Sequence, residues 1–273
     1  MALNIKNTFL KSLPLALLVL TTACQKVIDI DLKDTPKKMV IEAVVTDIAG
    51  QAKVLITQTK NYNESNTPDY LPGGKVSISD NEGNTVVFSE TATGRFEAPA
   101  LVGQASKTYT LKVEINNQTY TSSVKMPEKV VLDDAYITEE FLFGENRKMT
   151  TVDYQDPPGV GNFYRCVQFI NGKKDNTIYI NSDDYTDGRY MKDKLFYIAD
   201  EDKGQEVIKS GDEIKVEFMS LEKSVYKYWF SLDMGATGEN QAATPANPVS
   251  NITNGALGYF SVHPYQSKTF IVP

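Results

Sequence analysis

The sequence predicts an all-β protein: an N-terminal β-sandwich followed by a C-terminal antiparallel β-barrel or sandwich with one packed helix. Residue types that favour strands are abundant, with 15 Tyr and 12 Phe among 273 residues. Short runs of alternating apolar and polar residues are separated by turn residues along most of the chain. One stretch, near residues 221–234, instead repeats its apolar residues at helical spacing.

The first strand-rich range, residues 38–127, is predicted to form one β-sandwich domain. Its strand-like runs are 39–46, 53–57, 75–79, 85–89, 93–96, 108–115 and 118–126. Turn signals such as Ala49-Gly50 and the polar segment 80–84 separate these runs. Many short strands joined by closely spaced turns are typical of a β-sandwich.

The second range, residues 130–273, follows the boundary signal Met126-Pro127-Glu128. Its predicted strands are 135–143, 148–154, 163–171, 177–181, 194–199, 205–209, 213–220, 256–262 and 267–272. The predicted helix over 221–234 is expected to end at Gly235 or Gly238. Its apolar residues at helical spacing are Leu221, Val225, Tyr228, Trp229 and Leu232.

Residues 1–23 are predicted to be a bacterial lipoprotein signal peptide that is removed before Cys24. Lys6 and Lys11 make the start positive, and the apolar run 13–20 is shorter than the roughly 20 residues needed to span a bilayer. Thr21 departs from the usual pattern, which has Leu three residues before the cysteine. An ordinary secretory signal with a coincidental cysteine is the alternative. If the lipoprotein prediction holds, Cys24 carries the lipid and residues 24–37 form a tether.

The charge of the chain argues against nucleic-acid partners. The formal net charge is −7, and removal of the signal peptide with its two lysines makes it more negative still. Nucleic-acid binding needs clustered Lys and Arg. Membrane attachment is therefore expected from acyl chains, each buried methylene of which contributes about 0.8 kcal/mol.

The cysteine count predicts no internal disulfide. The chain has two cysteines, so acylation of Cys24 leaves Cys166 unpaired. Cys166 lies in an apolar run and is predicted to pack as a small buried hydrophobe. The one histidine, His263, is far away in sequence, and nothing in the pattern brings the two together.

Several segments, in order along the mature chain, carry a resemblance to a known family. These are 24–32, 40–47, 74–83, Asp156-Pro157-Pro158-Gly159, Asn162-Phe163-Tyr164-Arg165, and 247–252 with 255–260. The chain thereby resembles Bacteroidota lipoproteins grouped as domain-of-unknown-function family 4249. The resemblance implies an outer-membrane lipoprotein, often encoded near a TonB-dependent transporter, and a first domain similar to the immunoglobulin-like regulatory domain of carboxypeptidases. It implies no catalytic residue and no cofactor.

Residue types indicate two candidate sites. The acidic segment 181–188 offers oxygen ligands suited to Ca²⁺, but Tyr185 and Lys194 break the EF-hand spacing, so a solvated turn without a metal is expected. Loop tyrosines are candidate ligand contacts, because aromatic faces in loops serve recognition. They are Tyr62, Tyr70, Tyr185 and Tyr190, with Tyr265 as a further member of the group.

No catalytic motif is present in the sequence. Together with Cys24 and the all-β pattern, the family resemblance implies a non-catalytic accessory or binding component of a TonB-dependent uptake system, which is the favoured function. Surface exposure is favoured over a periplasm-facing anchor, because acidic residues follow Cys24 at a short distance. A carboxylate-based glycan hydrolase is one alternative, although the doublets Asp133-Asp134 and Glu139-Glu140 are poor catalytic pairs because neighbours on a strand face opposite ways. A structural or adhesive surface protein is the other.

Overall fold

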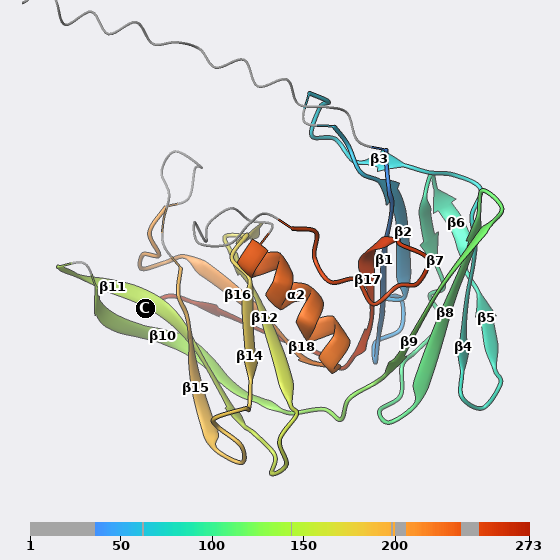
Figure 1. Cartoon of the computed structure of the whole chain (residues 1–273). Coiled ribbons are helices and arrows are strands. Elements are labelled where there is room, and N and C mark those ends of the chain that lie inside the picture. Colours follow the sequence, from blue (N-terminus) through green and yellow to red (C-terminus); the bar gives the residue numbers. More distant parts are fainter. Residues whose placement is uncertain (1–35, 62, 143, 198, 200–205, 236–245) are drawn as a thin grey trace, which may run out of the picture. The chain divides into compact units, whose positions relative to one another are not determined.

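Four β-sheets and one helix make up the described part of the chain in a computed structural model (Figure 1). The structure describes residues 36–61, 63–142, 144–197, 199, 206–235 and 246–273. The predicted signal peptide, Cys24 and Tyr62 lie outside these residues, as does nearly all of the predicted tether.

Sheet A combines strands from both ends of the described chain. It contains β1 (Met39–Thr46), β2 (Lys53–Gln58), β3 (Asp69–Tyr70), β6 (Ser89–Ala92), β7 (Arg95–Glu97) and β17 (Leu257–His263). The order is β17-β1-β2-β7-β6, with β3 beside β2. β17 pairs with β1 in parallel, so Ala43 lies opposite Phe260 (Figure 1).

Gly258 makes this parallel pairing sterically feasible. Its φ is +91°, a region that glycine enters without the steric penalty of a side chain. A Cβ at this position would overlap the carbonyl oxygen of Ile41 on β1. The close approach of β17 to β1 therefore depends on the absence of a side chain.

Sheet B closes the N-terminal sandwich. It contains β4 (Lys75–Asp80), β5 (Thr85–Val87), β8 (Thr108–Ile115) and β9 (Gln118–Lys125), in the order β5-β4-β8-β9. Alternate residues of sheets A and B point into one shared core, in which Ile41, Ile56, Ile78 and Leu111 are all buried. Sheets A and B thus form a β-sandwich, to which β17 contributes a strand from outside the range 38–127.

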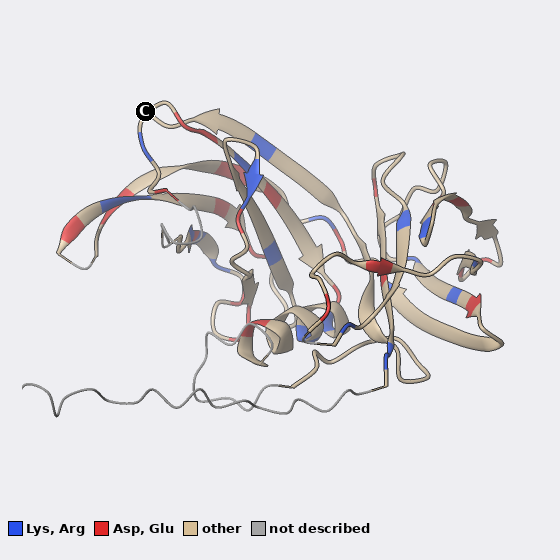
Figure 2. Ribbon diagram, turned by 90° about the horizontal axis from the view of Figure 1, so that it is seen from above, with Lys and Arg blue, Asp and Glu red and all other residues tan. Residues whose placement is uncertain are grey.

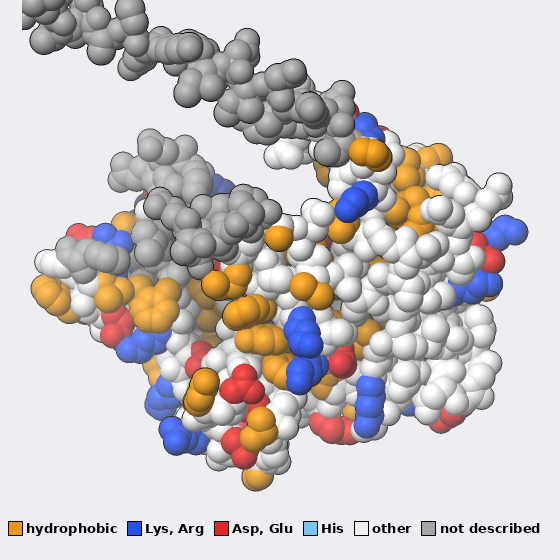
Figure 3. All heavy atoms as spheres, in the orientation of Figure 1, with side chains coloured by type: hydrophobic (Ala, Val, Ile, Leu, Met, Phe, Trp, Pro, Cys, Tyr) orange, Lys and Arg blue, Asp and Glu red, His pale blue; other side chains and the backbone are white. Residues whose placement is uncertain are grey.

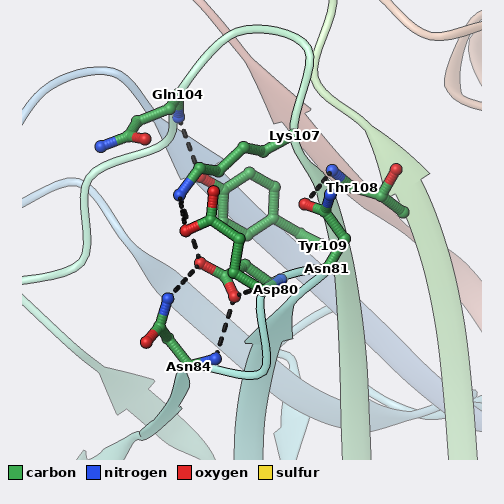
Figure 4. Close-up of polar contacts among 8 residues, drawn as sticks. Asp80, Asn81, Asn84, Gln104, Lys107, Thr108 and Tyr109 are labelled. Atoms are coloured by element: carbon green, nitrogen blue, oxygen red, sulfur yellow. Dashed lines mark hydrogen bonds and ion pairs between the residues drawn. The ribbon is translucent and has the colours of Figure 1, made fainter.

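Polar contacts fix the turn at one end of this sandwich (Figure 4). Asp80 accepts the backbone N–H groups of Glu82 and Asn84 at 3.0 Å each, which closes the turn between β4 and β5. Lys107 forms ion pairs with Asp80 and Glu82. The Tyr109 hydroxyl accepts the backbone N–H of Gln104 at 2.9 Å, five residues upstream, which fixes the entry to β8.

Sheets C and D form a second layered pair. Sheet C contains β10 (Leu132–Leu142), β11 (Glu145–Gln155) and β15 (Tyr190–Leu195); sheet D contains β12 (Phe163–Ile170), β13 (Lys173–Lys174), β14 (Tyr179–Ser182), β16 (Glu213–Leu221) and β18 (Tyr265–Ile271). Their shared core centres on Tyr154 of β11, whose ring centroid lies 4.7 Å from that of Tyr164 and 4.9 Å from that of Phe218.

Sheet D is covered on both faces because the side chains of β12 alternate. Tyr164 and Cys166 point into the core shared with sheet C. Phe163 and Val167 point the other way and join the core of the N-terminal sandwich and the helix. The strand thus reads as a nearly continuous apolar run, which is typical of a strand buried on both sides.

The helix α2 (Lys223–Gly235) packs on this second face of sheet D and against β17 (Figure 1). Val225 and Tyr228 are its buried residues, and Glu222 accepts the Ser224 backbone N–H just before the first turn. Figure 3 shows hydrophobic and Lys/Arg side chains side by side over α2. The helix predicted near 221–234 is confirmed, and it ends at Gly235 as expected.

The all-β prediction is confirmed, with several sheets and no closed barrel among the described residues. The C-terminal range was predicted to form either a barrel or a sandwich, and the described residues form the sandwich. Residues 206–209, predicted as part of a strand, are not in one. The closing strand β17, assigned by sequence order to the range 130–273, lies in sheet A.

Candidate functional site

A cavity of about 490 Å³ lies between the outer face of sheet A and the second face of sheet D. One wall comes from β17, β1 and β2, and the other from β12 and β16, while α2 contributes Trp229. Ligand pockets for small molecules have volumes of roughly 300–1,000 Å³. The cavity is therefore large enough for a small organic ligand.

Strand alternation selects the side chains that line this cavity. On β17, Tyr259, Ser261 and His263 face the cavity, whereas Phe260 and Val262 between them are buried in the sandwich core. On β12, Arg165 and Val167 face it from the opposite wall. Two strands distant in sequence thus each present one of their faces to the same space.

Arg165 is the least compensated charge at this site. Its Nε atom is buried and has no hydrogen-bond partner. The guanidinium carbon lies 3.5 Å from the centroid of the Trp229 ring, a cation–π contact, and Arg165 makes no ion pair with any described residue. Burial lowers the pKa of Arg165, because desolvation disfavours its charged form.

The rest of the charged lining is positive on balance. Lys53 and Lys174 face the cavity with Arg165, against a single lining carboxylate, Glu217. Glu217 is already engaged, since it accepts hydrogen bonds from Lys215 Nζ and the Tyr265 hydroxyl, both at 2.8 Å. Elsewhere on the described ribbon, acidic and basic residues are interspersed (Figure 2).

Ser261 and His263 form a hydrogen-bonded pair in the same wall. Ser261 Oγ lies 2.7 Å from His263 Nδ1. Burial lowers the pKa of His263 to about 4, so the imidazole is neutral at pH 7. The two side chains belong to residues only 2% and 6% exposed, which gives a substrate little access to the hydroxyl. The pair is best interpreted as a buried histidine whose polar atom is satisfied.

Cys166 lies on the opposite face of β12 from this pair. It is buried in the core between sheets C and D, as the sequence predicted, and burial raises the pKa of its thiol. A raised thiol pKa leaves little of the nucleophilic thiolate at neutral pH.

A second polar cluster joins the loops around residues 156–162 and 183–188. One carboxylate oxygen each of Asp156, Asp183 and Asp187 lies within 4.8 Å of the others. Each carboxylate accepts a backbone N–H: Asp156 from Gly188 at 2.8 Å, Asp183 from Gly161 at 2.8 Å and Asp187 from Gly159 at 2.6 Å. The ligand type suits a hard cation, but these bonds already account for the cluster as a device that holds two loops together.

The predicted solvated turn over 181–188 is wrong for Asp183. This residue is buried, because its carboxylate turns inward to bind the N–H of Gly161 and the amide of Asn162. The adjacent Asp184 and Tyr185 are oriented outward, and Tyr185 is 92% exposed.

The model of one protein family, described as a domain of unknown function (DUF4249), matches residues 25–269. The chain belongs to this family. The match spans nearly the whole chain, in agreement with the resemblance found in the sequence. No protein with curated annotation matches the chain.

The tyrosines predicted as ligand contacts in this DUF4249 protein lie on different sheets. Tyr70 is in β3, where Arg95 stacks over its ring at 4.8 Å and donates to its hydroxyl at 2.8 Å. Tyr190 is in β15 and is 50% exposed, and Tyr185 precedes it in the turn. Among the described residues, no ring contact joins these three. Tyr265 alone lines the cavity.

Arg165 was not singled out by sequence reasoning, although a signal for it exists. It is the only charged residue in the run Phe163–Ile170, which is otherwise typical of a buried strand. A charge in such a run is costly unless something compensates it. The partner strand β17 could not be found in the same way, because local pattern does not encode which strands pair.

Among the described residues of this DUF4249 protein, no helix combines the length and apolarity required to cross a bilayer.

Proposed function

We propose that this DUF4249 protein is a lipid-anchored, non-catalytic ligand-binding component of an outer-membrane uptake system that works with a TonB-dependent transporter. The observation that carries the binding role is the cavity of about 490 Å³ between sheets A and D. Its lining mixes aromatic faces with a few convergent polar groups, which is the usual composition of a small-molecule site.

The anchor in this proposal is the acylated Cys24, exposed on the cell surface. The support is the apolar run that ends in a small residue before Cys24, together with the family membership. Acyl chains hold a protein on a membrane without help from the fold.

A glycan hydrolase is less well supported by the same site. The carboxylate mechanism needs two acids facing each other across the substrate, roughly 5–9 Å apart. Among the described residues, the cavity wall has one carboxylate, Glu217, and the buried members of the aspartate cluster, Asp156 and Asp183, offer a sugar little access. Binding without chemistry is therefore the function that this geometry favours.

The test is to isolate the native lipidated protein from outer membranes in mild detergent and to identify what co-purifies. We expect a TonB-dependent transporter to co-purify. We also expect protease added to intact cells to cleave the wild-type protein, and Cys24→Ser to abolish both membrane attachment and this cleavage. Cys166→Ala is the matched control, since it removes the other cysteine and leaves the anchor. Recovery of the wild-type protein as a free monomer without a transporter would contradict the proposal.

A further inference from the structure

We propose that the cavity between sheets A and D binds a small organic anion through its carboxylate, and that the guanidinium of Arg165 is the main contact. This inference rests on the proposed ligand-binding function and names the class of ligand. Three observations carry it: a half-buried cation without an ion pair, a positive lining, and apolar aromatic surface beside the cation.

The first observation is that Arg165 lacks an anionic partner. A buried charge without a partner is strongly unfavourable, and native proteins pair such charges or use them. The Arg165 Nε is buried and makes no hydrogen bond, the guanidinium stacks on the Trp229 ring, and Glu217 attracts it without forming an ion pair. The stacking contact uses none of the N–H donors, so those on the two terminal nitrogens stay available to a ligand.

The second observation is the sign of the surrounding charge. Lys53 and Lys174 line the cavity with Arg165, whereas the one lining carboxylate, Glu217, is occupied by Lys215 and Tyr265. Glu42 on β1 lies near Lys174 and Lys53, and even with the carboxylates of Glu42 and Glu217 both charged, the three cations are in excess. An anion entering the cavity would therefore meet net positive charge.

The third observation concerns the shape of the anion. An arginine fork binds a planar carboxylate with two parallel hydrogen bonds, which a lysine does not do. The walls beside it are apolar and aromatic, from Trp229, Tyr259, Phe169 and Val167. A carboxylate joined to an apolar or ring-shaped body fits both features, whereas a phosphate alone would leave the aromatic wall unused.

Trp229 makes the test direct because it is the only tryptophan in the chain and it touches Arg165. The purified mature protein is titrated with benzoate, acetate, inorganic phosphate and chloride at constant ionic strength, and Trp229 fluorescence is recorded. We expect a saturable change with benzoate at concentrations at least tenfold lower than for acetate, phosphate or chloride. A stronger response to phosphate than to benzoate would overturn the carboxylate assignment.

The variants separate a binding role of Arg165 from a structural one. Arg165→Met is expected to abolish the benzoate response while leaving Tm equal or higher, because a half-buried charge without an ion pair is removed. Arg165→Lys keeps the charge without the fork and should weaken binding about tenfold. The matched control is Arg95→Met, which removes another arginine stacked on an aromatic ring, over Tyr70 in sheet A, and should leave the response unchanged.

Two results would overturn the inference. One is a benzoate response that survives in Arg165→Met; the other is a wild-type protein that shows no saturable response to any of the four anions. If the second result came with retained co-purification of a transporter, the anion site would be refuted and the proposed function would stand.

Discussion

Buried polar side chains in this protein fall into two groups at the scale of single residues. Asp156 and His263 are buried with hydrogen-bond partners, from Gly188 N–H and Ser261 respectively. Arg165 is half-buried, and its Nε atom is buried without a hydrogen-bond partner. Thr150 Oγ1 and Gln168 Oε1 are also buried without a partner, but of the three residues only Arg165 is charged and lines the cavity. Since buried polar groups in native proteins are nearly always satisfied, Arg165 is the residue to which a function is most reasonably assigned.

His263 should make stability depend on pH in a defined window. Its pKa is about 4 in the folded protein against an ordinary value of 6.5, so the unfolded chain binds the proton more readily. The stabilisation is therefore complete above pH 6.5 and is lost as pH falls towards 4. We expect this one residue to remove about 2 kcal/mol of unfolding free energy between pH 7 and pH 5.

Urea denaturation at pH 7 and pH 5 measures this effect. His263→Asn is the control, because the amide has no comparable titration and its polar atoms occupy a position similar to that of Nδ1. The pH-dependent loss should be smaller in this variant by about 2 kcal/mol, whatever the carboxylates contribute. Equal losses in the two proteins would show that His263 does not remain neutral when folded.

At the scale of elements, the local sequence pattern predicts a strand or helix where one of its faces is buried. It does not predict which strands pair when they are distant in sequence. The alternation in β4 and β8 and the helical spacing around Val225 and Tyr228 were visible in the sequence, since each depends on neighbours a few residues away. The partnership of β1 with β17 joins residues more than 200 positions apart. No local period encodes such a partnership, so the cavity wall formed by these two strands could not be predicted.

Gly258 provides a test of how tightly β17 depends on this pairing. Alanine at this position would carry both a strained φ of +91° and an overlap with the Ile41 carbonyl oxygen. We expect Gly258→Ala to lower the unfolding free energy by about 3 kcal/mol or more. Thermal and urea unfolding of the purified variant measure the change.

The matched control is Gly83→Ala in the turn between β4 and β5. Gly83 has the same φ, +91°, but nothing lies within 4 Å of an added Cβ. This variant carries the backbone strain alone, of about 1 kcal/mol. If both variants lost the same stability, steric contact between β17 and β1 would not be the reason that position 258 requires glycine.

At the scale of the whole molecule, the chain returns to its own first sheet before it ends. β17 is the edge strand of sheet A and lies beside β1 (Figure 1). Its Phe260 and Val262 are fully buried in the core of the N-terminal sandwich. The loop before β17 is also bound to sheet B, since the Thr253 N–H donates to the Thr121 carbonyl at 2.9 Å. The sandwich over 38–127 is thus completed by residues from the far end of the sequence.

Because β17 completes sheet A, we predict that residues 24–127 do not fold stably alone. Loss of β17 removes two fully buried side chains and leaves β1 as an unpaired edge strand. Removal of a buried Phe side chain such as that of Phe260 lowers the unfolding free energy by about 3–5 kcal/mol. That loss is comparable to the whole stability of a typical domain, about 5–15 kcal/mol. The isolated segment should show no cooperative thermal transition and should aggregate, whereas the full chain should unfold in one main transition.

Restoring the missing strand should rescue the segment. We expect a cooperative thermal transition to return when residues 249–264 are joined after residue 127 by a flexible Gly/Ser linker. The added segment carries β17 and the loop that binds β9. The same appended segment with Phe260→Asp is the control, because a carboxylate in the position of a fully buried ring prevents docking. A sharp, reversible transition in residues 24–127 without the added strand would show instead that the sandwich is an independent domain and that β17 only lies against it. In that case the wall that carries Tyr259, Ser261 and His263 could separate from β1 without unfolding the sandwich, and the cavity would open through movement of one strand.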